Sequence, residues 1–515
     1  MAQPTHTYSI TAPGFMGLNT QDASVDLDPK FALEANNCVI DKFGRVGSRN
    51  GWTAANDTSA TLGSNSIGAI GELIDSVGTK TVVAAGNNKL FKLVGTTLTE
   101  LTYGGGGATP TITANNWQTC ILQSCILFFQ IGYDPLIFDT AVSSTTYRRL
   151  SEHASYTGTV PLANCAISAY GRIWAANTTT DKNTVTWSDT LTFQKWTAGS
   201  SGSLNLYGVW PQGGDEIVAL AAHNNFLIIF GSKQILIYSG AATPSTMVLS
   251  DAISNAGIVG RDCVQATPDD LAYLSRGGLR SIKRTIQEKS APIVTLSKNV
   301  NDDIIRYIGN ETTGATIKSI YVPSTSYLLF TFVESEITYC FDTRSPLQDG
   351  SYRATTWTGI TPSCYCYSLT NKLYFGQPGY IALLGGYQDN GASYRMSYYT
   401  SWVDFGDPIK TSILKKIAVT LFGAASQIFT YKWGFDYVSQ IRSEQVTLTS
   451  VATIAYYDVS EYNIGEYDTG SSVNVVTANA GGSGKVIQAG IEADVSGVQI
   501  SVQRFDIYTK DGAYK

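Results

Sequence analysis

Three histidines and eight cysteines are the residues of this 515-residue chain that could most readily bind a transition metal. The histidines are His6, His153 and His223, and none has a second histidine at the spacing of a zinc-protease motif. Cys364 and Cys366 stand two positions apart without a second pair at zinc-finger spacing. On a strand their side chains would share one face, which favours packing in a core. The sequence therefore predicts no metal site.

One glycine-rich segment, residues 481–485, reads Gly-Gly-Ser-Gly-Lys and resembles part of a phosphate-binding loop. The full motif needs glycine at position 479 and serine or threonine at position 486, where this chain has Asn479 and Val486. A helix should follow the motif, but the next residues alternate as a strand does. We therefore expect neither a nucleotide nor any other cofactor.

Carboxylates could hydrolyse a glycosidic bond if two of them converged on one sugar. The segment Trp187-Ser-Asp189, followed by Trp196, resembles a turn motif of glycosidases in which aspartate fixes a hairpin and tryptophan packs beneath it. That motif is structural even in those enzymes. Nothing in the sequence pairs the other available carboxylates, which are Asp215, Glu216, Asp269 and Asp270. We predict no catalytic residue and a protein that is not an enzyme.

Composition excludes several classes of protein. Charged residues make up 15 % and hydrophobic residues 43 %, so the chain has material for a core and too little charge for disorder. The net charge of −6 is unlike that of a basic nucleic-acid binder. The longest apolar runs fall short of the roughly 20 residues that a membrane-spanning helix needs, so we expect no membrane-spanning segment. The first residues do not resemble a signal peptide, and the thinly spread cysteines favour a reducing compartment.

Short runs rich in Val, Ile, Thr, Tyr and Phe, separated by Gly, Asn, Asp and Ser, predict an all-β fold. Helical periodicity is weak and confined to residues 29–37 and 299–308. Sets of four runs recur every 45–55 residues, roughly the period of propeller blades. The clearest set is Ile317–Val322, Tyr327–Phe332, Ile337–Asp342 and Tyr352–Thr358. Stacking four-stranded sheets around an axis buries faces that one sheet alone would expose.

Three zones follow from this pattern. Residues 53–391 are predicted to form a β-propeller of six or seven four-stranded blades. Residues 392–515 alternate in longer runs around a polar segment, 467–484, and predict a β-sandwich-like domain with a long polar loop. Residues 1–52 are polar and extended in character, and we expect them to form an extended N-terminal arm.

The N-terminal zone carries a family resemblance. It contains Gly14-Phe-Met-Gly-Leu-Asn19, Asp26-Leu-Asp-Pro29, Ala35-Asn-Asn-Cys-Val-Ile40 and Gly44-Arg-Val-Gly-Ser-Arg-Asn-Gly-Trp52. Further matching segments are residues 217–239, Gly257-Ile-Val-Gly-Arg-Asp-Cys-Val264 and Leu271-Ala-Tyr-Leu-Ser-Arg-Gly-Gly-Leu-Arg280. This layout, which covers essentially the whole chain, resembles the tail-nozzle (tail hub) proteins of short-tailed bacteriophages.

The resemblance implies a structural protein of the virion tail, assembled in the host cytoplasm. Members of that family combine a propeller with β-domains and form a homohexamer, a ring below the head-to-tail adaptor ring. Genomic DNA passes through the channel of the ring without specific binding, and tail fibres or spikes and a central plug attach nearby. Arg45 and Arg49 are candidate contacts to the adaptor or to neighbouring subunits; alternatively they anchor the arm on the first blade.

A second hypothesis is a carbohydrate-binding or carbohydrate-cleaving propeller that acts in receptor recognition. Its support is the content of 30 Tyr and 9 Trp, because aromatic faces stack on sugars. The same residues would equally fill the interfaces between blades. A cellular scaffold propeller is a third hypothesis, although such a protein would not need the N-terminal zone in this form.

Overall fold

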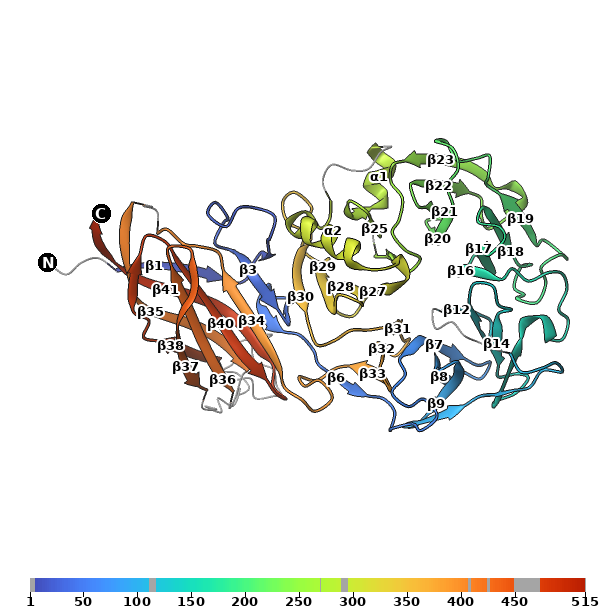
Figure 1. Ribbon diagram of the computed structural model, residues 1–515, viewed down its shortest axis with the longest axis horizontal. Coiled ribbons are helices and arrows are strands. Elements are labelled where there is room, and N and C mark those ends of the chain that lie inside the picture. Colours follow the sequence, from blue (N-terminus) through green and yellow to red (C-terminus); the bar gives the residue numbers. More distant parts are fainter. Residues whose placement is uncertain are drawn as a thin grey trace, which may run out of the picture.

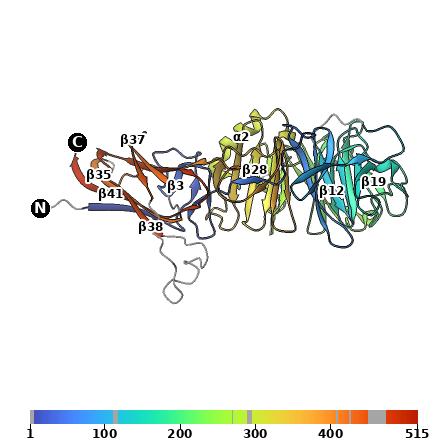
Figure 2. The ribbon, with the colours of Figure 1, turned by 90° about the horizontal axis from the view of Figure 1, so that it is seen from below.

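A computed structural model describes residues 5–110, 117–268, 270–288, 295–405, 409–423, 427–448 and 473–514. A ring of small sheets lies beside a second β-structure that holds the first and last strands of the chain (Figure 1). Seen edge-on, the ring is a disc and the second body extends from its rim, so the molecule is elongated (Figure 2).

The ring is a β-propeller. Among the described residues, six of its sheets contain blades of four strands or more, and one sector has three strands. The first three blades consist of β7 (Ile67–Ile74), β8 (Lys80–Gly86), β9 (Lys89–Val94) and β10 (Thr97–Glu100); β11 (Thr102–Tyr103), β12 (Gln118–Leu122), β13 (Cys125–Phe129), β14 (Leu136–Asp139) and β15 (Thr146–Arg149); β16 (Ala163–Ala169), β17 (Arg172–Thr178), β18 (Thr184–Trp187) and β19 (Gly202–Asn205). The prediction of six or seven blades is therefore confirmed, with one sector smaller than expected.

The ring continues through four further sheets. They consist of β20 (Ile217–His223), β21 (Phe226–Gly231), β22 (Gln234–Ser239) and β23 (Val248–Ser254); the three-stranded sector β24 (Val264–Ala266), β25 (Leu271–Ser275) and β26 (Gly278–Ser281); β27 (Ile317–Val322), β28 (Tyr327–Phe332), β29 (Ile337–Asp342) and β30 (Arg353–Trp357); β31 (Tyr365–Tyr367), β32 (Leu373–Gln377) and β33 (Tyr380–Leu384). The inner strands of successive sheets contact one another from β7 to β31, and β31 contacts β7 again. The ring is thus closed.

The N-terminal part of the chain completes the last blade. Strand β6 (Trp52–Ala54) pairs antiparallel with β33, with Ala54 opposite Ala382. The earliest strand of the ring is therefore the outermost strand of its last blade. This pairing supplies a fourth strand that residues 364–384 alone do not provide.

The second body is a β-sandwich. One sheet has the order β38-β35-β41-β5-β4, with β1 and β39 paired at its sides, and the other includes β3-β34-β40-β36-β37. The bounds are β1 (Thr5–Thr11), β2 (Gly17–Leu18), β3 (Phe31–Asn36), β4 (Cys38–Ile40), β5 (Val46–Ser48), β34 (Tyr394–Thr400), β35 (Lys410–Gly423), β36 (Ile428–Phe435), β37 (Val438–Thr447), β38 (Val473–Ala478), β39 (Gly482–Gly484), β40 (Ile487–Val495) and β41 (Ile500–Tyr514).

An extended N-terminal arm was expected over residues 1–52, and the described residues of this zone include strands of the sandwich. They are extended, as expected, but β1 pairs with β41, and β3 pairs with β34. Cys38 and Ile40 are buried in the cluster that includes the sandwich core, whereas Val39, on the opposite face of β4, packs against Val322, Leu329, Cys340 and Trp357 of the propeller. The sandwich thus joins residues 5–48 to residues 394–514, and the propeller is inserted between them.

One sheet runs through both bodies. Strands β27–β30 of the propeller continue through β3 into the sandwich, which gives a ten-stranded sheet. At the junction Asn36 pairs with Thr356, and the amide of Asn37 donates to the Thr356 carbonyl at 2.7 Å. The Trp357 indole donates to the Cys38 carbonyl at 3.0 Å. The two bodies are therefore joined by one β pair between β3 and β30 and by these hydrogen bonds, as well as by connecting chain.

Helices are short. They are α1 (Ile282–Glu288), α2 (Asn301–Asn310) and the 3₁₀ turns Leu150–Glu152, Pro244–Thr246, Lys298–Val300 and Gly314–Thr316. Helix α2 confirms the helical signal over residues 299–308, whereas residues 29–37 contain strand β3 instead. No helix in the described part of the chain is long and apolar enough to cross a membrane.

Candidate functional site

Arg49, one of the two arginines that the sequence singled out, is fully buried after β5. Its Nη1 and Nη2 atoms contact the two carboxylate oxygens of Asp389 at 2.9 and 2.7 Å. Its Nε donates to Asn37 Oδ1 at 2.8 Å, and the carbonyls of Asn50 and Thr358 accept the remaining N–H groups. All five guanidinium donors thus have a partner within the chain.

This geometry gives Arg49 the anchoring role of the two that we considered. The guanidinium also lies 4.0 Å from the centre of the Tyr394 ring, whose hydroxyl donates to the Arg49 carbonyl. Asp389 stands between β33 and β34, so the anchor joins the N-terminal strands to the exit of the last blade and not to the first blade. A contact from this side chain to a neighbouring subunit would require the ion pair to open.

Arg45 lies in the turn between β4 and β5 and is half-buried. Its Nε donates to Gln503 Oε1 at 2.6 Å, and its guanidinium carbon lies 4.0 Å from the centre of the Phe422 ring and 4.5 Å from that of Phe43. The side chain is thus held against the first sheet of the sandwich. Its contact to an adaptor stays a prediction.

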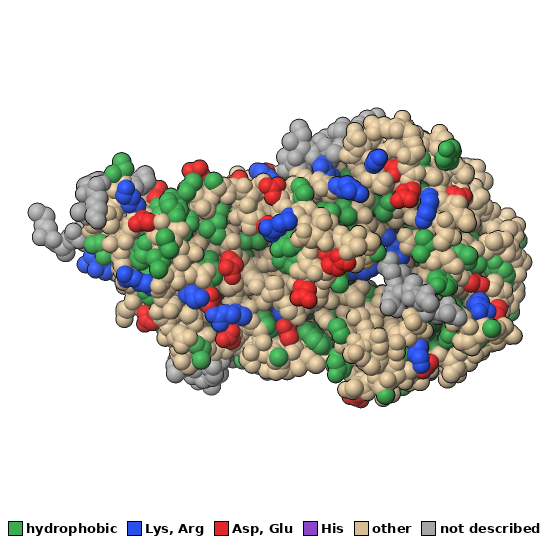
Figure 3. Space-filling view, viewed as in Figure 1, with side chains coloured by type: hydrophobic (Ala, Val, Ile, Leu, Met, Phe, Trp, Pro, Cys, Tyr) green, Lys and Arg blue, Asp and Glu red, His purple; other side chains and the backbone are tan. Residues whose placement is uncertain are grey.

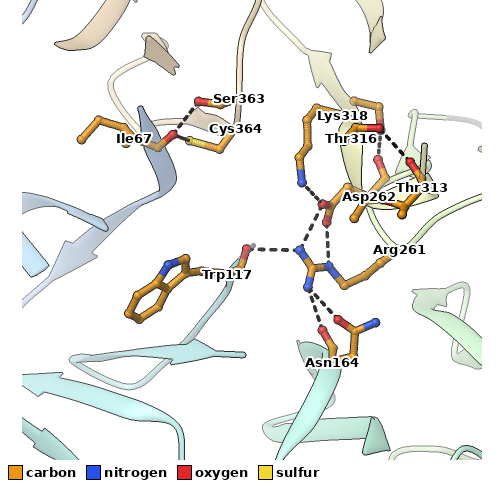
Figure 4. A network of polar contacts seen from close by, with 12 residues as sticks. Ile67, Trp117, Asn164, Arg261, Asp262, Thr313, Thr316, Lys318, Ser363 and Cys364 are labelled. Atoms are coloured by element: carbon orange, nitrogen blue, oxygen red, sulfur yellow. Dashed lines mark hydrogen bonds and ion pairs between the residues drawn. The ribbon is translucent and has the colours of Figure 1, made fainter. Parts of the chain in front are cut away.

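A second charged cluster, missed at the sequence level, lies at the axis of the propeller (Figure 4). Asp262 accepts from Arg261 Nε at 3.1 Å and from Lys318 Nζ at 2.6 Å. Arg261 also donates to the carbonyls of Asn164 and Trp117, at 2.9 and 3.2 Å. These contacts join four sectors of the ring across its axis. We call Arg261, Asp262 and Lys318 the axial triad.

The axial triad crosses a cavity of about 260 Å³ that the inner strands enclose. Figure 3 shows the corresponding hollow at the ring axis, with basic side chains at its rim. Gln118 and Gln265 line it and make further contacts between blades: Gln118 accepts from the Ala166 amide at 2.6 Å, and Gln265 donates to the Ser319 carbonyl at 3.0 Å. The polar groups of the axis therefore hold the blades together.

Electrostatics make the Asp262 carboxylate a weak base. Burial alone would raise its pKa, but the charges of Arg261 and Lys318 outweigh that effect and hold the pKa of Asp262 well below its usual range. A general base needs a pKa near the working pH. The sequence contained one signal for this cluster, an adjacent Arg-Asp pair between apolar runs in a chain of low charge, but Lys318 lies too far along the chain to be paired with it from sequence.

The carboxylates considered for glycoside hydrolysis do not converge. Asp215 accepts from the amides of Ser232 and Lys233 at 3.0 and 2.9 Å and fixes the turn between β21 and β22. Asp270 accepts from the Lys283 amide at 3.0 Å, at the start of α1 in the next sector. Glu216 is exposed, and Asp269 lies outside the described residues.

The segment from Trp187 to Trp196 forms the turn device that its sequence predicted. Asp189 accepts from the amides of Thr190 and Ser200 at 2.8 and 2.9 Å. The hydrogen bonds from the Ser200 backbone and side chain hold the pKa of Asp189 below its ordinary value. Trp196 is buried and donates to the Phe193 carbonyl at 3.0 Å. The interpretation as a structural motif is confirmed.

The remaining motifs also lie in structural positions. Cys364 and Cys366 pack in one apolar cluster, and burial raises the pKa of each thiol to about 12, which keeps both protonated at neutral pH. Residues 482–484 of the glycine-rich segment form strand β39. Within the ranges that the structure describes, no group of three or more His, Cys, Asp or Glu side chains is placed so that it could hold a metal ion.

Comparisons with known proteins give no family. No family model matches the chain, and no curated protein matches it. Among solved structures, the chain is similar to PorZ of the type-IX secretion system of Porphyromonas gingivalis (TM-score 0.38, 11 % identity, 68 % of this chain and 43 % of that one). It is also similar to the extracellular domain of a hybrid two-component system from B. thetaiotaomicron (TM-score 0.38, 11 % identity, 65 % of this chain and 41 % of that one). A third similar structure is the Pan2 WD40 domain of Neurospora crassa (TM-score 0.37, 10 % identity, 66 % of this chain and 95 % of that one). The chain thus spans less than half the length of the first two. Likenesses at this level concern the fold and say nothing about function.

Proposed function

We propose that this chain is a non-enzymatic structural protein of a phage tail, the nozzle. Six copies would form a ring below the head-to-tail adaptor and extend the channel for genome ejection. Tail fibres or spikes and a central plug would attach near the ring. The proposal starts from the sequence resemblance and takes its structural support from how the two β-bodies are joined.

The observation that carries the proposal is the ten-stranded sheet shared by propeller and sandwich. A subunit of a load-bearing ring must hold its two ends at a fixed angle, and paired strands across the junction resist bending in a way that a linker does not. The buried Arg49–Asp389 ion pair lies beside the same junction. Both features favour a rigid building block over a propeller that presents a ligand on a flexible stalk.

The structure of the propeller axis limits the path that the DNA could take. A cavity of about 260 Å³ that the axial triad crosses cannot pass a duplex. In the proposed ring, the DNA would therefore run along the axis between subunits and not through any single propeller. The net charge of −6 is compatible with such a channel, because basic contacts would hold passing phosphates.

The test is quantitative mass spectrometry of gradient-purified phage particles, with this chain counted against the portal protein and the major capsid protein as the internal standard. A sixfold ring on a twelvefold portal predicts one copy of this chain for every two portal chains. Absence from the particles, or a copy number that follows the trimeric fibres, would refute the nozzle assignment.

A further inference from the structure

A small pocket with an aromatic wall opens on the outer face of the sandwich part of the ten-stranded sheet. Its volume is about 230 Å³. It is lined by Leu33, Glu34, Tyr399, Trp402, Tyr437, Ser439, Gln440 and Gln488, which we call the aromatic pocket. These residues come from β3, β34 and the segment after it, β40, β37 and the turn that joins β36 to β37.

A tight turn holds the aromatic wall in place. Asp436 and Tyr437 both have positive φ, 50° and 67°, as a two-residue hairpin turn requires. The Asp436 carboxylate accepts from the Lys485 amide at 2.7 Å, which ties the turn to the chain before β40. The Tyr437 ring lies 5.3 Å from the Trp402 ring, centre to centre, and the Tyr437 side chain is 51 % exposed. A tyrosine thus stands at the mouth of the pocket on a backbone conformation that tyrosine rarely adopts.

The lining of the pocket holds an unpaired acceptor. Gln488 is 4 % exposed, and its Nε2 donates to the Thr400 carbonyl at 3.1 Å. Its Oε1 is buried and has no hydrogen-bond partner among the described residues. Such an atom destabilises the fold unless a donor reaches it. If the Gln488 side chain turned toward the pocket, a ligand hydroxyl would supply that donor.

Two further lining residues, Tyr399 and Glu34, contribute an aromatic ring and a carboxylate. The Tyr399 ring lies against the backbone at Gly490, where a Cβ atom would come within 2.2 Å of it, and its hydroxyl donates to Glu492. Glu34 is an exposed carboxylate at the rim that accepts from Ser397. No lysine or arginine lines the pocket. The site therefore favours a neutral ligand rich in hydroxyl donors over an anionic one.

We propose that the aromatic pocket binds one neutral sugar ring of an oligosaccharide. The apolar C–H face of a pyranose packs on an exposed aromatic ring such as that of Tyr437. Its hydroxyls donate to the exposed Glu34 carboxylate and, once the Gln488 side chain has turned toward the pocket, to Gln488 Oε1. This site lies on the sandwich, away from the propeller axis, and does not depend on the nozzle assignment.

The test uses the full chain on an array of neutral and acidic bacterial oligosaccharides, followed by calorimetry with the neutral glycans that bind. We expect neutral glycans to be selected. Tyr437→Ala and Gln488→Leu should each weaken binding at least tenfold. Tyr207→Ala, which removes a 75 % exposed tyrosine from a blade of the propeller, is the matched control and should bind as the wild type does.

A thermal melt of each variant shows whether a loss of binding results from a loss of folded structure. Gln488→Leu removes an unpaired acceptor together with one hydrogen bond, so it should melt close to the wild type. Failure of every glycan on the array to bind would overturn the proposal, as would selection of acidic glycans alone. So would binding that Tyr437→Ala and Gln488→Leu leave unchanged, or that Tyr207→Ala alone abolishes.

Discussion

At the residue scale, the charges that matter most in this molecule are buried and paired. Arg49 meets Asp389 across the domain junction, and Arg261 and Lys318 meet Asp262 at the propeller axis. Loss of one partner of such a pair leaves an uncompensated charge out of water, which costs far more than loss of a surface pair.

Arg49→Met should therefore lower the free energy of unfolding by about 3–5 kcal/mol, because Asp389, whose side chain is 14 % exposed, loses its counter-ion. Denaturant unfolding measures the change. Lys89→Met is the control, since both side chains of the Lys89–Glu100 pair are 39 % exposed and their loss should cost less than about 1 kcal/mol. Equal shifts in the two variants would contradict the anchoring role of Arg49.

Asp262 should make stability depend on acid pH. Its pKa in the folded protein lies below the ordinary value of 3.8, so its contribution is present above that value and disappears as the pH falls through the folded pKa. Melting temperatures measured from pH 6 to pH 2 should therefore fall less steeply below about pH 4 in Asp262→Asn than in the wild type. Lys318→Met should shift the loss of this stability to higher pH, because it removes one of the two cations that hold the pKa of Asp262 down. Parallel wild-type and Asp262→Asn profiles would disprove this account.

The sequence could indicate which residues matter but not which residues they contact in the fold. Arg49 was singled out with two roles left open, and its partner Asp389 lies 340 positions away. Arg261 and Asp262 stood in a segment quoted for the resemblance, but their position at the ring axis depends on how the blades close. Gln488 has no sequence signal, because only the three-dimensional packing leaves its oxygen unpaired.

At the scale of elements, the strands of the blades were predictable because alternation and turn residues are local. The apolar runs of β27–β29 and the glycine- and asparagine-rich turns fix those strands without knowledge of the rest. Residues 29–37 were predicted as helix and contain β3, because tertiary pairing with β34 overrides a weak local preference. The role of β6 in ring closure could not be predicted, since β33 lies in a distant part of the chain.

Ala55→Pro should weaken the closure of the ring. The Ala55 amide donates to the Ile381 carbonyl at 2.8 Å, and proline has no N–H to make that bond. We expect a loss of more than about 1 kcal/mol in unfolding free energy and faster hydrogen exchange in β32 and β33. Ala55→Thr keeps the amide and serves as the control. Unchanged exchange in these two strands would show that β6 is not needed for closure.

At the scale of the whole molecule, propeller and sandwich should unfold together. The ten-stranded sheet and the Arg49–Asp389 pair both span the junction, so neither body can lose its strands without disturbing the other. Differential scanning calorimetry should record one main transition, whose midpoint Arg49→Met lowers without splitting. Two separate transitions in the wild type would contradict this coupling.

The insertion of the propeller between the two parts of the sandwich has a consequence for synthesis on the ribosome. Strand β6 is made early, but its partner β33 follows about 330 residues later, which at roughly 5–20 residues per second means a wait of tens of seconds. The strands of the sandwich are complete still later, because β1 pairs with β41. A nascent chain therefore carries unpaired strand edges until β33 and β41 have been made, and a chain that ended before β33 would display neither body in finished form. A copy that ended before β41 would lack the partner of β1 and β35, which is an inherent check against the assembly of incomplete copies.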